Sequence, residues 1–170
     1  LDQQDLQDWL HLLINEYPEA NITLYGVSMG ASAVLNLAGS DLPKQVDTVI
    51  ADSGFTSVAE IFETQLNDTL HLPSFPIMNA ANSVSKLRIN LDFYQASTVA
   101  LVPNIKIPIF YIHGELDNFV PVSNVHALAK ATSSPHHVWV VENANHGEAV
   151  KVQPDEYRKR LHEFIQNERD

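Results

Sequence analysis

The stretch Ile22-Thr23-Leu24-Tyr25-Gly26-Val27-Ser28-Met29-Gly30 decides the fold of this chain. Its first half is apolar, and small apolar residues follow it at helical spacing. The stretch therefore predicts a strand that turns sharply at Ser28 and enters a helix ending near Gly39. A strand followed at once by a helix is typical of α/β folds with a parallel sheet.

The turn has the Gly-x-Ser-x-Gly pattern of a nucleophile elbow. A serine on so tight a turn has strained backbone angles, and side chains two residues away would collide, so glycine is needed at both Gly26 and Gly30. The following helix points its N-terminus at Ser28, and the Met29 amide faces the place where negative charge develops in acyl transfer. Ser28 is therefore a candidate nucleophile, and Met29 a candidate for the oxyanion hole. The alternative is a βα turn without chemistry.

Composition indicates one globular domain, because 45% of the 170 residues are hydrophobic and 18% are charged. Ten basic residues and 21 acidic ones give a net charge of −11, which disfavours nucleic acid and anionic membranes as partners. The chain has no cysteine, so disulfides, thiolate catalysis and zinc–thiolate sites are excluded. No motif predicts a metal or a cofactor. No stretch approaches the ~18 apolar residues of a membrane span, so we expect a soluble chain without membrane contact.

Short apolar runs predict four strands, over residues 22–27, 46–51, 107–112 and 137–141. Helical spacing predicts one helix before Pro18, one after Ser28, and two more over 122–131 and 155–166. This alternation predicts a doubly wound α/β fold, with a parallel sheet of about four strands and helices on its faces.

Residues 53–106 show no strand pattern and predict a helical insertion between the second and third strands. Two helices are expected there, separated by Pro73 and Pro76. An insertion at the carboxyl end of a strand lies where ligands enter open α/β folds, so it is either a lid or an ordinary pair of covering helices. Five residues are candidates for an acyl pocket or for the core: Phe55, Phe62, Phe75, Met78 and Phe119.

A serine nucleophile needs a base and an acid that orients the base, and in α/β-hydrolases the chain order is serine, acid, histidine. Of eight histidines, His146 lies in a small polar loop after the last strand, at the sheet edge that also holds Ser28. Asp117, in the loop after the third strand, is the expected acid, and His113 is expected to support that loop. Three other carboxylates compete for the acid role, the first most strongly: Asp52, Glu115 and Glu148.

These segments resemble the α/β-hydrolase superfamily, and specifically the bacterial group of serine-aminopeptidase-like and esterase-like cell-surface hydrolases. The resemblance spans essentially the whole chain and rests on residues 24–32, 51–57, 112–121 and 144–148. It implies a cofactor-free hydrolase of ester or amide bonds, with a triad of Ser28, Asp117 and His146 and with the Met29 amide in the oxyanion hole.

The chain departs from this group before the elbow strand, where the family has further strands and a loop with the second oxyanion donor. The resemblance therefore implies a carboxyl-terminal portion of low activity, taken from a parent with a membrane anchor and an extracytoplasmic location. Its elbow strand would be an exposed sheet edge, which predicts a homodimer. The alternative to an enzyme is a non-catalytic binding or assembly module on a hydrolase scaffold.

Overall fold

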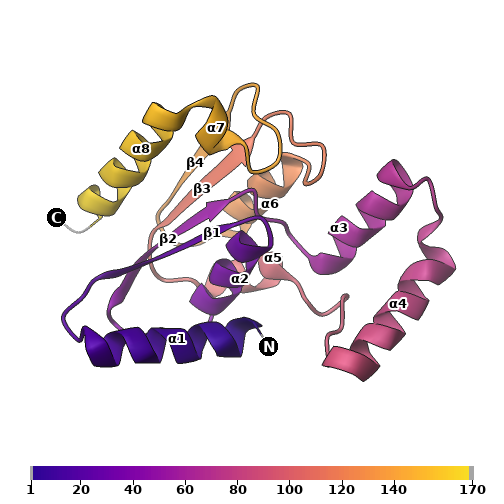
Figure 1. Cartoon of the computed structure of the whole chain (residues 1–170), viewed down its shortest axis with the longest axis horizontal. Helices are drawn as coiled ribbons and strands as arrows, with labels where there is room; N and C mark the ends of the chain where they lie inside the picture. Colours follow the sequence, from indigo (N-terminus) through magenta and orange to yellow (C-terminus); the bar gives the residue numbers. More distant parts are fainter. Residues whose placement is uncertain (1, 169–170) are drawn as a thin grey trace.

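A four-stranded parallel sheet lies at the centre of the structure, a computed structural model that describes residues 2–168 (Figure 1). The strands lie side by side in chain order. They are β1 (Ile22–Val27), β2 (Val46–Asp52), β3 (Ile109–Gly114) and β4 (His136–Val141). Because every pairing is parallel, the carboxyl ends of the strands meet at one edge. The predicted α/β fold is confirmed.

Helices cover both faces of the sheet (Figure 1). Val49 and Ala51 of β2 belong to the core on one face, and Ile50 between them belongs to the core on the other. Burial on both faces explains why β3 is an almost unbroken apolar run. The first face packs against α1 (Asp2–Glu16), α2 (Met29–Ala38) and α6 (Ser123–Ala131), and the second against α7 (Ala149–Val152) and α8 (Pro154–Asn167).

The third strand begins two residues later than predicted. Residues 107–112 were expected, whereas β3 starts at Ile109 and continues to Gly114. Pro108 has no N–H to donate to a ladder, and its carbonyl oxygen accepts from the Val49 amide at 3.0 Å. The extension at the other end places His113 inside the sheet.

The insertion of residues 53–106 is helical. It contains α3 (Val58–Thr64), the π-helical turn η1 (Gln65–Thr69), α4 (Ser74–Ile89), α5 (Thr98–Leu101) and the 3₁₀ turn η2 (Val102–Asn104). Figure 1 shows α3 and α4 standing away from the sheet. An antiparallel bridge between Ser57 and Ser97 joins the residue before α3 to the residue before α5. Pro73 precedes α4, whereas Pro76 lies in its first turn, where a missing N–H costs no helical hydrogen bond.

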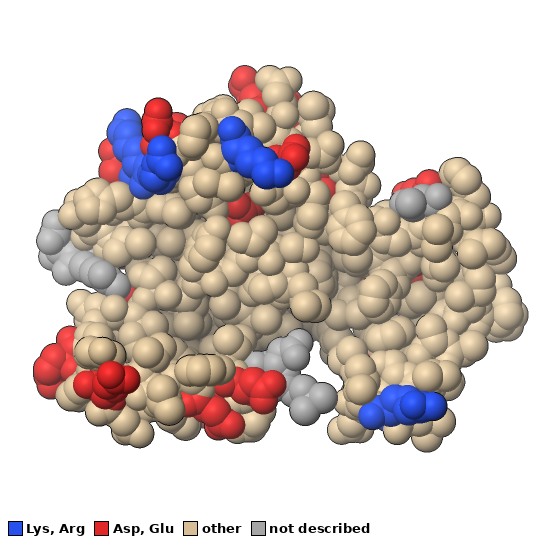
Figure 2. Space-filling view, viewed as in Figure 1, with Lys and Arg blue, Asp and Glu red and all other residues tan. Residues whose placement is uncertain are grey.

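Charged side chains are unevenly spread over the surface. Figure 2 shows acidic side chains gathered over α1, and basic ones over α7 and α8 and at the end of α4. On α8 the basic residues pair with acids of the same helix, as Arg158 does with Asp155 at 2.8 Å and Arg160 with Glu156 at 2.7 Å. The face over α1 is therefore the more acidic one. Among the helices of residues 2–168, none is long and apolar enough to cross a membrane.

One edge of the described sheet is formed by β1. Its side chains alternate in burial, so that Leu24 is buried while Tyr25 and Val27 are partly exposed. The pairing of this edge with a second copy stays a prediction.

Candidate active site

Ser28 occupies the sharp turn between β1 and α2. Its φ of 56° and ψ of −119° belong to a region that side chains rarely adopt and that stores strain. The turn is held by β2, because the Ser28 amide donates to the Asp52 carbonyl oxygen at 2.8 Å. Glycine is required at position 26, since a Cβ on Gly26 would lie 2.2 Å from the carbonyl oxygen of Gly30. The sequence thus forms the strained strand-to-helix turn that its glycine spacing predicts.

The prediction that Gly30 is needed for the same steric reason is wrong. Apart from its chain neighbours and the backbone of its own helix, a Cβ on Gly30 would meet no described atom within 4 Å. The close contact is one-sided. The backbone of Gly30 occupies the place that a Cβ on Gly26 would take, whereas the place of a Cβ on Gly30 is open.

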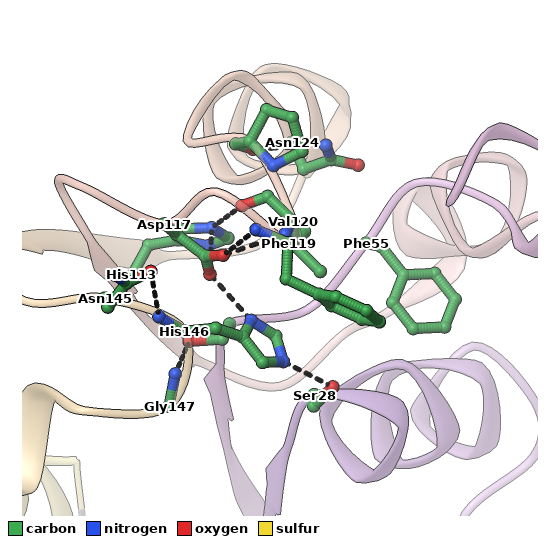
Figure 3. A network of polar contacts seen from close by, with 12 residues as sticks. Ser28, Phe55, His113, Asp117, Phe119, Val120, Asn124, Asn145, His146 and Gly147 are labelled. Atoms are coloured by element: carbon green, nitrogen blue, oxygen red, sulfur yellow. Dashed lines mark hydrogen bonds and ion pairs between the residues drawn. The ribbon is translucent and has the colours of Figure 1, made fainter. Parts of the chain in front are cut away.

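His146 lies between Ser28 and Asp117 (Figure 3). Its Nε2 is 2.8 Å from Ser28 Oγ, and its Nδ1 is 2.7 Å from Asp117 Oδ2. An ionised carboxylate only accepts hydrogen bonds, so Nδ1 carries the proton and Nε2 presents its lone pair to the Ser28 hydroxyl. That tautomer is the one a general base needs. The three side chains follow β1, β3 and β4, whose carboxyl ends share one edge of the sheet.

Asp117 is held by four donors. Its Oδ1 accepts from the amides of Phe119 at 3.0 Å and Val120 at 2.8 Å, and its Oδ2 faces both His146 and His113. Burial by itself raises the pKa of Asp117, but the hydrogen bonds from His113, His146 and the Val120 amide outweigh it and hold the pKa below the usual range. Asp117 is therefore ionised at neutral pH.

His113 is completely buried. Its Nε2 lies 2.9 Å from the Val120 carbonyl oxygen and 3.3 Å from Asp117 Oδ2. Both are acceptors, so the proton is on Nε2. Its Nδ1 has no hydrogen-bond partner among the described residues. His113 supports the loop after β3, as expected, but sequence reasoning missed its contact with the acid. The available signal was its position four residues before Asp117.

Asp52, the stronger rival for the acid role, is buried and engaged elsewhere. Its Oδ2 accepts from the Tyr157 hydroxyl at 2.8 Å, and its Oδ1 from the Ser53 hydroxyl at 2.9 Å. Burial raises the pKa of Asp52, and these hydrogen bonds offset the rise only in part. The Ser53 hydroxyl in turn accepts from the Gly147 amide at 3.2 Å. Asp52 therefore reaches the loop of His146 through Ser53.

The two weaker rivals make other contacts. Glu115 accepts from the Asn143 amide at 3.2 Å, and Glu148 pairs with Lys151 at 3.3 Å. Within residues 2–168, no group of three His, Cys, Asp or Glu side chains is placed to hold a metal ion.

Met29 is the first residue of α2, and its side chain is exposed. Amides in the first turn of a helix have no acceptor within that helix and carry the positive end of its dipole. The Met29 amide follows Ser28 directly, so it is a candidate donor to an oxyanion at that serine. Its participation in an oxyanion hole stays a prediction.

A cavity of about 440 Å³ opens beside Ser28, within the size range of small-molecule sites. Of the five apolar residues singled out in the sequence, three line it: Phe55, Phe62 and Phe119. The other two do not, because Phe75 is largely exposed and Met78 is buried in a small core cluster of the insertion.

The comparison with known families agrees with this geometry. Residues 2–169 match the sequence model of the prolyl oligopeptidase family. The chain belongs to this family. The resemblance to the α/β-hydrolase superfamily is thereby confirmed, and the chain is a member of a hydrolase family.

Known relatives of this prolyl oligopeptidase family member are longer than the chain. The Bacillus subtilis protein YqkD is 30% identical over 170 residues, which are 99% of this chain and 56% of YqkD. The chain therefore spans about half the length of this curated relative. A Pyrococcus furiosus esterase superposes with a TM-score of 0.75 at 23% identity, covering 99% of this chain and 62% of the esterase. A Pyrococcus horikoshii acylaminoacyl peptidase superposes with a TM-score of 0.69 at 14% identity, covering 96% and 26%. These two structures show the shared fold.

Proposed function

We propose that the chain carries the nucleophile, base and acid of a serine hydrolase that cleaves carboxylic ester or peptide bonds through an acyl-enzyme. One observation carries the proposal: His146 joins Ser28 to Asp117 by contacts of 2.8 and 2.7 Å. Ser28 and His146 are 118 positions apart in the sequence, so no local turn accounts for their contact. Membership of a hydrolase family supports the same conclusion.

In this mechanism His146 Nε2 takes the hydroxyl proton as Ser28 Oγ attacks the substrate carbonyl carbon. The tetrahedral intermediate carries its negative charge on the former carbonyl oxygen, where the Met29 amide and the N-terminal end of α2 stabilise it. His146 then gives its proton to the leaving alcohol or amine, and an acyl ester remains on Ser28. Water, deprotonated by the same imidazole, then attacks that ester. The bond from the acyl carbon to Ser28 Oγ breaks, His146 returns the proton to Oγ, and the carboxylic acid is released. Asp117 keeps Nδ1–H in place and stabilises the imidazolium.

The rate depends on how many donors meet the oxyanion. The family resemblance places a second donor in a loop that precedes the elbow strand, and loss of one donor costs about 10²–10³ in turnover. We therefore expect the 170-residue chain alone to acylate at Ser28 but to turn over slowly.

A fluorophosphonate probe tests the proposal, because it phosphonylates an activated serine without needing turnover. We expect labelling of the chain that disappears in Ser28→Ala and falls sharply in His146→Ala. The matched control is Ser83→Ala, an exposed serine of α4, which should keep full labelling. A folded chain that is unreactive, both alone and within any longer protein that contains it, would instead make it a binding or assembly module. Panels of p-nitrophenyl esters and aminoacyl amides then separate esterase from peptidase.

A further inference from the structure

One face of α2 forms the floor of the cavity beside Ser28. The helix lines it with Met29, Ser32, Ala33 and Asn36, whose spacing of i, i+3, i+4 and i+7 places them on a single helical face. At a rise of 1.5 Å per residue, this face runs about 12 Å from Ser28 to Asn36. The floor is therefore an elongated surface that begins at Ser28 and ends at Asn36.

The other walls are mainly apolar, and Gln3 and Thr98 are the polar residues that line them. The insertion supplies three residues of α3: Val58, Ile61 and Phe62. Phe119 lies next to His146 (Figure 3), with its ring centre 5.0 Å from that of the imidazole, and Phe55 also lines the cavity. None of the described residues that line the cavity carries a charge.

The hydroxyl of Ser32 on the floor is already engaged, whereas Asn36 Oδ1 at the far end of the floor is buried without a hydrogen-bond partner among the described residues. Ser32 Oγ accepts from the Phe55 amide at 3.1 Å and donates to the Phe55 carbonyl oxygen at 3.3 Å. A charged group in this cavity would lose its water without gaining a partner of opposite charge, which is strongly unfavourable. An alkyl chain would lose only unfavourable contact with water.

We propose that this cavity binds the acyl group of the substrate, and that this group is an uncharged aliphatic chain of medium length. The inference rests on the proposed function, since attack by Ser28 places the substrate carbonyl at one end of the floor. Each methylene group buried there raises kcat/KM by roughly fourfold. The gain ends where the acyl chain is longer than the floor of the cavity, which is about 12 Å long.

Esters of one leaving group test the proposal: p-nitrophenyl acetate, butyrate, octanoate and palmitate. We expect kcat/KM to rise at least tenfold from acetate to octanoate and to fall again at palmitate. Ala33→Phe places a ring in the middle of the floor and should lower the octanoate-to-acetate ratio at least tenfold. The matched control, Ala80→Phe on the exposed surface of α4, should keep the ratio. If Ala33→Phe does not fold, Phe62→Ala decides, because losing that wall also lowers the ratio.

A neutral ketone that cannot be hydrolysed separates this proposal from the proposed function. We expect 2-decanone, but not acetone, to raise the melting temperature of the unsubstituted chain and of Ser28→Ala. The rise should be smaller in Ala33→Phe. Ketone binding without any hydrolysis that depends on Ser28 would support the cavity and refute the proposed function. Hydrolysis that depends on Ser28 but has equal kcat/KM for acetate and octanoate would leave the function standing and overturn the acyl site.

Discussion

Gly114, the last residue of β3, lies directly against the backbone of Ala144: a Cβ on Gly114 would come within 2.5 Å of the Ala144 carbonyl oxygen. The same oxygen accepts from the Leu116 amide at 2.9 Å. The loop that carries Asp117 and the loop that carries His146 are therefore in backbone contact. This contact explains why a carboxylate and an imidazole from two different loops lie within hydrogen-bonding distance.

Gly114→Ala should separate these two loops. The added methyl group has no space, so we expect the free energy of unfolding to fall by about 1–3 kcal/mol. Labelling of Ser28 by the fluorophosphonate should slow by at least tenfold, because misplacement of a base by about 1 Å can cost 10² in rate. Urea unfolding and labelling rates provide the measurements.

Gly30→Ala is the matched control for stability. Its Cβ meets open space, and alanine is the better helix former by about 1 kcal/mol, so stability should be kept or raised. Equal stability of Gly114→Ala and the parent would show that the contact between the loops is not tight.

Asp117→Asn should lower the rate of Ser28 acylation by about 10⁴, the cost of the equivalent change in serine proteases, because the amide no longer holds the Nδ1–H tautomer. Asp52→Asn alters the rival carboxylate, whose hydrogen bonds go to Tyr157 and Ser53, and should cost much less. If Asp52→Asn lowered the acylation rate more than Asp117→Asn does, the acid role would belong to Asp52.

Asp117→Asn also tests how the free energy of unfolding depends on pH. The pKa of Asp117 is held below its ordinary value of 3.8 in the folded chain, so the unfolded state binds more protons under acidic conditions. Its stabilising contribution is therefore complete above pH 3.8 and is lost as the pH falls toward the folded pKa. We expect the difference in unfolding free energy between parent and Asp117→Asn to shrink below pH 3.8. A difference that stays constant on acidification argues against the charged contacts of Asp117.

Ser53→Ala tests whether the buried Asp52 positions the loop of His146. The Ser53 hydroxyl donates to Asp52 and accepts from the Gly147 amide. Removing it leaves the buried Asp52 carboxylate and the partly buried Gly147 amide each short of a partner, which costs about 1–3 kcal/mol of stability. We also expect kcat to fall with little change in KM, since Gly147 is next to His146 and Ser53 is not among the residues that line the cavity beside Ser28.

A buried serine elsewhere is the control for Ser53→Ala. Ser85 of α4 is buried, and its hydroxyl has no partner among the described residues, so Ser85→Ala should be neutral or stabilising. If Ser53→Ala loses stability but keeps the parent kcat and the parent pH profile, its role is structural only.

Much of the fold could be predicted because its signals are local. Apolar runs bounded by turn residues predicted all four strands, and only the two ends of β3 differ from the predicted bounds by more than one residue. The glycine spacing predicted the turn at Ser28, since a backbone in this conformation leaves no space for a Cβ at Gly26. Local signals were weaker for the five apolar residues proposed for the acyl pocket or the core. Phe55 and Phe75 look alike in the sequence, yet Phe55 lines the cavity and Phe75 is exposed.

The order of the residues along the chain determined the α/β sheet and placed one serine, one histidine and two competing aspartates at its carboxyl edge. Only the tertiary structure decided which of the two aspartates contacts His146. Asp52 and Asp117 both follow buried strands, but Asp52 lies under Tyr157 while Asp117 faces the imidazole of His146. The physical reason is that hydrophobic periodicity determines which residues enter a strand, whereas the direction of a side chain beyond the strand depends on contacts between loops that are far apart in the sequence.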